Sequence, residues 1–157
     1  MSSFPGSQSL ARGRSYFSLV AGTSPGAGNN FTYVVAGEYV QTPLSVHVRV
    51  TADATVATRQ PKLVFTDQGG TEFAAVASSV GVTASQAKTY QFAAAFGGIL
   101  TGVDAAVTTG LPLPQIPLLP GFQLQFLIGN IQAGDTITAI FLYIERAHLD
   151  YGAAGDV

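Results

Sequence analysis

Charge is scarce in this sequence. Asp, Glu, Lys and Arg together make up 10% of its 157 residues, whereas an ordinary soluble domain carries about 25%. A chain of this length buries roughly 70% of its extended surface on folding, so much of its exterior must consist of small polar and apolar side chains. Such a surface is desolvated at low cost and keeps a free monomer poorly soluble. The composition therefore predicts a structural subunit that packs against neighbours.

Cysteine is absent, which excludes disulfides and the usual Cys/His zinc sites. His47 and His148 are the two histidines, and the nine acidic residues are spread singly, most of them at turns. No Gly-x-Ser-x-Gly elbow, phosphate-binding loop or dinucleotide fingerprint occurs. We therefore expect no catalytic residues, no metal, no cofactor and no small-molecule substrate, and hence no enzyme.

Clustered positive charge and long apolar runs are missing as well. The seven basic residues are scattered and the net charge is −2, which provides no electrostatic footprint for nucleic acid or an anionic membrane surface. No stretch approaches the roughly 20 apolar residues of a membrane-spanning helix, and residues 1–16 lack the apolar core of a secretory signal. We expect no nucleic-acid partner and no membrane association.

The pattern that is present has a period of two. In residues 44–51, Leu44, Val46, Val48 and Val50 alternate with polar side chains, which is typical of a half-buried strand. Further strands are predicted at Tyr16–Ala21, Phe31–Ala36, Lys62–Thr66, Thr71–Ala77, Thr89–Phe96 and Phe122–Ile128. In the last strand, Ile137, Phe141 and Tyr143 fall on one face and Ile140, Leu142 and Ile144 on the other. Both of its faces are apolar, which predicts a central or sandwiched position.

Seven or eight short strands, with turn signals at intervals of roughly ten residues, indicate an all-β fold. We predict a single antiparallel, jelly-roll-like β-sandwich over residues 15–157. Residues 1–14 show no periodicity and are predicted to form an extended N-terminal arm. The segment Leu111–Gly121 contains four prolines and cannot be an interior strand, because proline donates no ladder hydrogen bond.

Two segments are candidates for an interface. One is the proline-rich segment, with its large apolar side chains Leu111, Leu113, Ile116, Leu118 and Leu119; the alternative is that these pack over an open end of their own sandwich. The other is the N-terminal arm, where Phe4, Arg12, Arg14 and Tyr16 are anchors of the kind that interfaces use. The alternative for the arm is an unpartnered, frayed terminus.

A turn with a mechanical role is predicted before the last strand. In Gln132–Thr136, Gly134 is expected to adopt a positive φ while the Asp135 side chain accepts local amide hydrogen bonds. This arrangement would fix the register of the strand that follows.

Several stretches resemble small structural proteins of tailed bacteriophages. In Val46–Arg59 (VHVRVTADATVATR), a strand ends in Thr-Ala-Asp-Ala, a short Val-Ala turn follows, and an arginine opens the next strand. The later order is also similar: a proline-rich stretch, Pro120-Gly121, then Gly134–Ile137 leading to Ile144–Arg146. The resemblance spans roughly residues 44–146 and describes a β scaffold rather than a site.

The resemblance implies a virion protein with a jelly-roll or similar sandwich. Proteins of this kind and size often act as cement or decoration on the capsid exterior, where they reinforce joints between major capsid subunits. The implied partners are the major capsid protein and copies of the chain itself, a homo-oligomer assembled in the host cytoplasm. A tail, collar or head-fibre component is the alternative. More distant is a carbohydrate-binding attachment module that uses Tyr33, Tyr39, Tyr90 and Tyr151.

Overall fold

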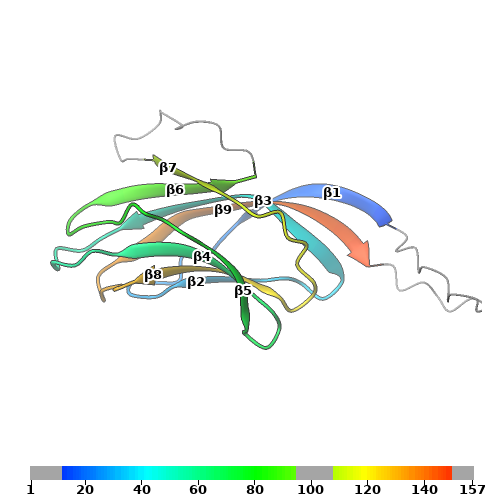
Figure 1. Ribbon diagram of the computed structural model, residues 1–157, viewed down its shortest axis with the longest axis horizontal. Helices are drawn as coiled ribbons and strands as arrows, with labels where there is room; N and C mark the ends of the chain where they lie inside the picture. The colour runs from blue at the N-terminus through cyan, green and yellow to red at the C-terminus, as the bar shows by residue number, and fades with distance from the viewer. Residues whose placement is uncertain (1–11, 95–107, 150–157) are drawn as a thin grey trace, which may run out of the picture.

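The structure, a computed structural model, describes residues 12–94 and 108–149, which form two β-sheets (Figure 1). The first sheet has the order β1-β9-β3-β6-β7 and the second β2-β8-β4-β5. The first contains β1 (Arg12–Ala21), β3 (Tyr39–Thr51), β6 (Ala87–Ala93), β7 (Thr108–Pro112) and β9 (Thr136–Leu149). The second contains β2 (Phe31–Val34), β4 (Gln60–Thr66), β5 (Glu72–Ala77) and β8 (Gln123–Gly129). The all-β prediction is confirmed, and these ranges hold no helix that could span a membrane.

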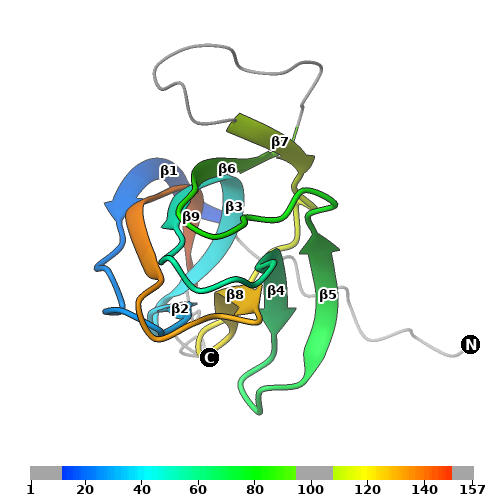
Figure 2. The same cartoon turned by 90° about the vertical axis from the view of Figure 1, so that its left-hand side faces the viewer.

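The two sheets lie face to face as the layers of a sandwich (Figure 2). Neighbouring strands are antiparallel, except that β6 and β7 run parallel. The chain repeatedly crosses from one sheet to the other, and the last strand, β9, lies between β1 and β3. This central position of the last strand was predicted. The short strand β7 was not, because its sequence, Thr-Thr-Gly-Leu-Pro, shows no apolar alternation.

The core lies between the sheets, where alternating side chains from both layers meet. Val46, Val48 and Val50 of β3 are fully buried, as the period-two pattern predicts. From the opposite sheet, Phe126 packs against Tyr90 and Phe92 of β6, with ring centroids 6.2 Å apart in each pair. Because both sheets contribute apolar faces, these residues form one continuous core.

Two β-bulges interrupt the alternation that the sequence predicts. The register of β3 shifts between Pro43 and Ser45, and Leu44 is therefore only half-buried. In β9, a second shift accompanies Ala139, whose φ is +48°. Ile137 consequently lies on the buried face with Ile140, whereas Phe141 is exposed. The predicted common face for Ile137 and Phe141 is wrong, because the bulge changes which side of the sheet each side chain occupies.

A fully buried ion pair joins the loop before β4 to the turn before β9. The Arg59 Nε donates to Asp135 Oδ2 at 2.9 Å, and an Arg59 terminal nitrogen donates to Asp135 Oδ1 at 2.8 Å. The same terminal nitrogen also donates to Asp53 Oδ1, and the other terminal nitrogen donates to the carbonyls of Thr55 and Ala57. All of its nitrogen atoms are thereby hydrogen-bonded, which is the condition for burying a guanidinium group.

Gly134 meets a different requirement from the predicted one. Asp135 does accept a local amide hydrogen bond, from Gln132 at 2.8 Å, and also one from the amide of Asp53 at 2.9 Å. The φ of Gly134, however, is not in the left-handed region. A Cβ at this position would lie 2.7 Å from Asp53 Oδ2. Glycine is therefore required by the close approach of Asp53 rather than by a positive φ.

Candidate interaction surface

The outer face of the five-stranded sheet carries exposed apolar side chains on the neighbouring strands β1 and β9, beside the half-buried His47 of β3. We define the outer aromatic row as Phe17 and Leu19 of β1, Phe141 and Tyr143 of β9, and His47 of β3. The exposed fractions are 61% for Phe17, 67% for Leu19, 42% for Phe141 and 41% for Tyr143. Exposed apolar residues that are contiguous in this way mark interaction sites on soluble proteins.

Strand register brings these side chains together. Leu19 lies opposite Tyr143, and His47 lies opposite Phe141 on the other side of β9. Residues directly opposite in an antiparallel pair share a face of the sheet. Since Ile140, Leu142 and Ile144 of β9 point into the core, the residues between them must point outward. This explains why β9 is apolar on both faces.

Ring contacts join side chains of the outer aromatic row across neighbouring strands. Phe17 stacks on Tyr143 with ring centroids 5.8 Å apart and an interplanar angle of 21°. The His47 ring lies 6.0 Å from that of Phe141. Partial burial lowers the pKa of His47, which favours the neutral imidazole. Glu145, opposite Phe17, puts a carboxyl group on the same face. Such a surface can bury apolar area against a flat partner.

The structure corrects part of the predicted interface in the proline-rich segment. Leu113 and Leu118 are buried in the protein's own core, with exposed fractions of 4% and 1%. Leu111 and Ile116 are half-buried against the same core. The backbone of Leu118 also exchanges two hydrogen bonds with Gln41 of β3, at 3.0 and 2.8 Å. Proline excludes this segment from the sheet interior but not from the core. Leu113 and Leu118 pack in the protein's own sandwich, as in the alternative interpretation, and Leu111 and Ile116 do so in part.

Leu119 is the one candidate of that segment that remains exposed, at 47%. In the N-terminal segment, β1 already begins at Arg12, so the predicted arm boundary at residue 14 is displaced. Arg12 and Arg14 lie in this strand, and Phe4 lies outside the described residues. Tyr16 is 44% exposed and packs edge-to-face on Tyr39 with ring centroids 6.1 Å apart.

Two of the four tyrosines considered for carbohydrate binding lie close together. The Tyr33 hydroxyl donates to Gln41 Oε1 at 2.7 Å and accepts a hydrogen bond from Arg146 at 3.4 Å. The Arg146 guanidinium in turn lies 6.0 Å from the ring centroid of Tyr39. Tyr90 is fully buried, which raises its pKa to about 12. Tyr151 lies outside the described residues, so the structure does not assemble the four into a platform.

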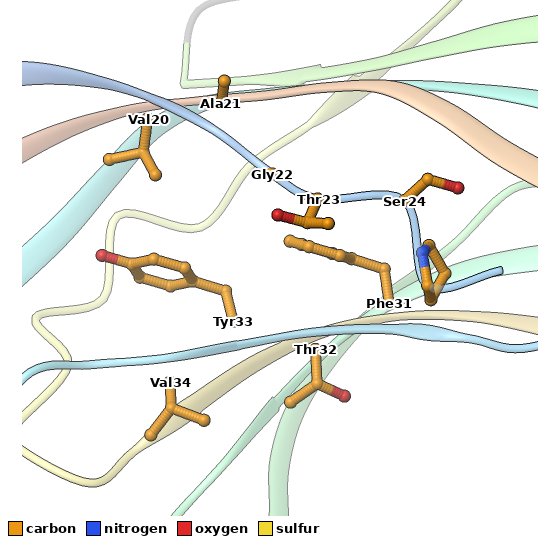
Figure 3. A pocket seen from close by; sticks show the side chains of 10 residues that line it. Val20, Ala21, Gly22, Thr23, Ser24, Phe31, Thr32, Tyr33 and Val34 are labelled. Atoms are coloured by element: carbon orange, nitrogen blue, oxygen red, sulfur yellow. The ribbon is translucent and has the colours of Figure 1, made fainter.

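A shallow cavity of about 480 Å³ opens between the end of β1 and β2, lined by residues 20–25 and 31–34 (Figure 3). The Phe31 and Tyr33 rings lie below the chain at Gly22 in this view. Tyr33 carries the one titratable side chain among the lining residues. In the part of the chain that the structure describes, no three His, Asp or Glu side chains are grouped as a metal site.

The apolar pattern of β9 held a signal for the outer aromatic row, although it was interpreted only as a sign of a central or sandwiched strand. An apolar strand face is equally consistent with an exposed surface that awaits a partner. Comparison of the sequence with protein-family models gives no match, and comparison with curated proteins gives none either.

Proposed function

We propose that this protein is a non-enzymatic virion component that binds the capsid shell of a tailed bacteriophage and reinforces joints between major capsid subunits. The observation that carries the proposal is the outer aromatic row: Phe17, Leu19, Phe141 and Tyr143 are exposed together on one face. The resemblance of Val46–Arg59 to small phage structural proteins supports the choice of partner.

The row is adequate to hold the protein on a shell. Burying one large apolar side chain completely contributes roughly 1.5–3 kcal/mol, so the row offers several kcal/mol, from which the cost of association must be subtracted. Many copies on one shell would act together, because each adds buried area across a joint. Burial lowers the pKa of His47 and so favours the neutral imidazole, which costs less to desolvate than the charged form.

We further propose that the sandwich is a jelly roll. Four strands of one sheet, β1-β9-β3-β6, face the four of the other, β2-β8-β4-β5, and the chain crosses between the sheets at every connection except β4–β5 and β6–β7. Strand β7 is then an addition at one edge. Jelly rolls of eight strands recur in viral capsid and lectin domains, which agrees with the proposed setting on a virion exterior.

Co-sedimentation with empty shells of the corresponding phage tests the proposal. The double variant Phe17→Ser/Tyr143→Ser removes two exposed rings without opening a cavity in the core. Val56→Ser is the matched control, since Val56 is 94% exposed on a loop outside the row. We expect the row variant to bind at least about tenfold more weakly and the control to bind like the wild type.

Two results would overturn the proposal: wild-type protein that stays in the supernatant, or equal binding by the row variant. The copy number separates the capsid from the tail. Binding at a single vertex, rather than over the whole shell, would favour the tail or collar alternative.

A further inference from the structure

Strand β1 forms one edge of the five-stranded sheet (Figure 2). It is ten residues long, and among the described residues it pairs only with β9. Within the described ranges, its other side therefore presents unpaired backbone groups along much of its length. Natural edge strands are usually short, or are protected against pairing with another chain.

The free backbone groups can be assigned to particular residues. The amide of Gly22 donates to the carbonyl of Ile140 at 2.8 Å, in register with the pair Ala21–Phe141. Hydrogen-bonded pairs alternate along an antiparallel ladder, so the even-numbered residues of β1 point their N–H and C=O groups toward β9. Phe17, Leu19 and Ala21 point theirs away from the sheet.

The usual protective features are missing from this edge. Ser15–Ala21 contains no charged residue, proline or glycine, and its register with β9 is continuous. Phe17 and Leu19 are also the most exposed side chains of the outer aromatic row. Phe17 and Leu19 therefore contribute both to the unpaired backbone edge and to the exposed apolar surface.

We propose that β1 pairs antiparallel with β1 of a second copy around a two-fold axis at Leu19, joining two five-stranded sheets into one. The segment is complementary to itself: Leu19 faces Leu19 of the other copy, and the large Phe17 faces the small Ala21. No charged residue between Ser15 and Thr23 opposes a like charge across the axis. Such an isologous contact closes on itself, and the outer aromatic rows of both copies form one continuous surface.

This pairing requires no capsid, so its test is independent of shell binding. The informative variant is Leu19→Pro, which removes an outward N–H that makes no bond within the described sheet. Proline is tolerated at such edge positions. Leu19→Ala is the matched control, because it removes the same side chain but keeps the N–H.

Analytical ultracentrifugation of the full chain is the measurement. We expect the wild type to be a dimer at a protein concentration of about 100 µM or below, and we expect Leu19→Ala to dimerise as well. The dissociation constant of the Leu19→Pro dimer should be at least about tenfold higher than that of Leu19→Ala. Circular dichroism confirms that each variant is folded. A monomeric wild type, or equal dimerisation of the two variants, would overturn the proposal.

Amide hydrogen exchange of the wild type keeps the proposal testable if Leu19→Pro does not fold. In the dimer, the amides of Phe17, Leu19 and Ala21 are protected like those of Ser18 and Val20, and they lose that protection on dilution. Fast exchange at the three outward amides at high concentration, with Ser18 and Val20 protected, would contradict the pairing.

Discussion

Arg59 and Asp135, 76 positions apart in the chain, form a two-point ion pair with both side chains fully buried. The pair joins the loop that follows β3 to the turn that precedes β9. Both segments are connections between the two sheets, so the ion pair joins two of these connections at one end of the sandwich. Burying two charged side chains carries a large desolvation penalty, which is offset only when their hydrogen-bonding groups are satisfied.

Removing one partner of this pair should destabilise the fold strongly. Asp135→Asn removes the fully buried carboxylate and leaves the Arg59 guanidinium with the partly exposed Asp53 as its anionic partner; breaking a buried pair typically costs about 3–5 kcal/mol. Urea denaturation measures the free energy of unfolding. Glu72→Gln is the control, because the exposed Lys62–Glu72 pair, at 3.6 Å, should contribute only about 0–1 kcal/mol. Comparable losses in the two variants would contradict this explanation.

The same pair predicts a pH dependence at the acidic end. Burial alone would raise the pKa of Asp135, but hydrogen bonds from Arg59 and from the amides of Gln132 and Asp53 lower it below its ordinary value of 3.8. A carboxyl whose pKa is lowered by folding contributes stability above the unfolded-state pKa and loses it as the pH falls toward the folded-state value. The stability difference between wild type and Asp135→Asn should therefore shrink below about pH 4. A difference that stays constant from pH 7 to 3 would exclude this contribution.

Ala139→Gly should stabilise the protein. Ala139 is exposed and has a φ of +48° in the β9 bulge, a conformation that disfavours residues with a Cβ by about 1 kcal/mol. Thermal unfolding should show a higher Tm for this variant. Ala93→Gly, at an ordinary position in β6, should lower the Tm, because glycine weakens a regular strand. A decrease in both variants would show that the bulge is not strained.

Gly134→Ala should destabilise the fold, because the new Cβ would lie 2.7 Å from Asp53 Oδ2 and disturb the contacts of Arg59. We expect a loss of about 1–3 kcal/mol in chemical denaturation. Gly37→Ala provides the comparison, since a Cβ there meets no atom within 4 Å. If the two substitutions have equal effects, crowding at Gly134 is not what requires glycine.

The predictable part of this fold is the part governed by local periodicity. Alternation placed Val46, Val48 and Val50 correctly in the core. The local sequence pattern does not predict the bulge at Ala139, because the bulge arises from how β9 fits between two neighbouring strands. The partnership of Arg59 and Asp135 is likewise tertiary, since it appears only when distant loops meet.

The candidate surface illustrates a second limit. Apolar residues on both faces of β9 predicted a central strand correctly, but centrality within a sheet does not cover its outer face. Phe141 and Tyr143 remain exposed because the described residues provide no layer above them. Conversely, Leu118 was a candidate for the surface and lies in the core, because its backbone pairs with Gln41.

The most direct test of the central claim is a cryo-electron microscopy map of phage shells saturated with this protein. We expect copies distributed over the whole shell, with the outer aromatic row of β1, β9 and β3 in contact with major capsid subunits at their joints. A map in which Phe17 and Tyr143 face solvent while another surface contacts the shell would contradict the claim. So would a shell that carries no copies at all.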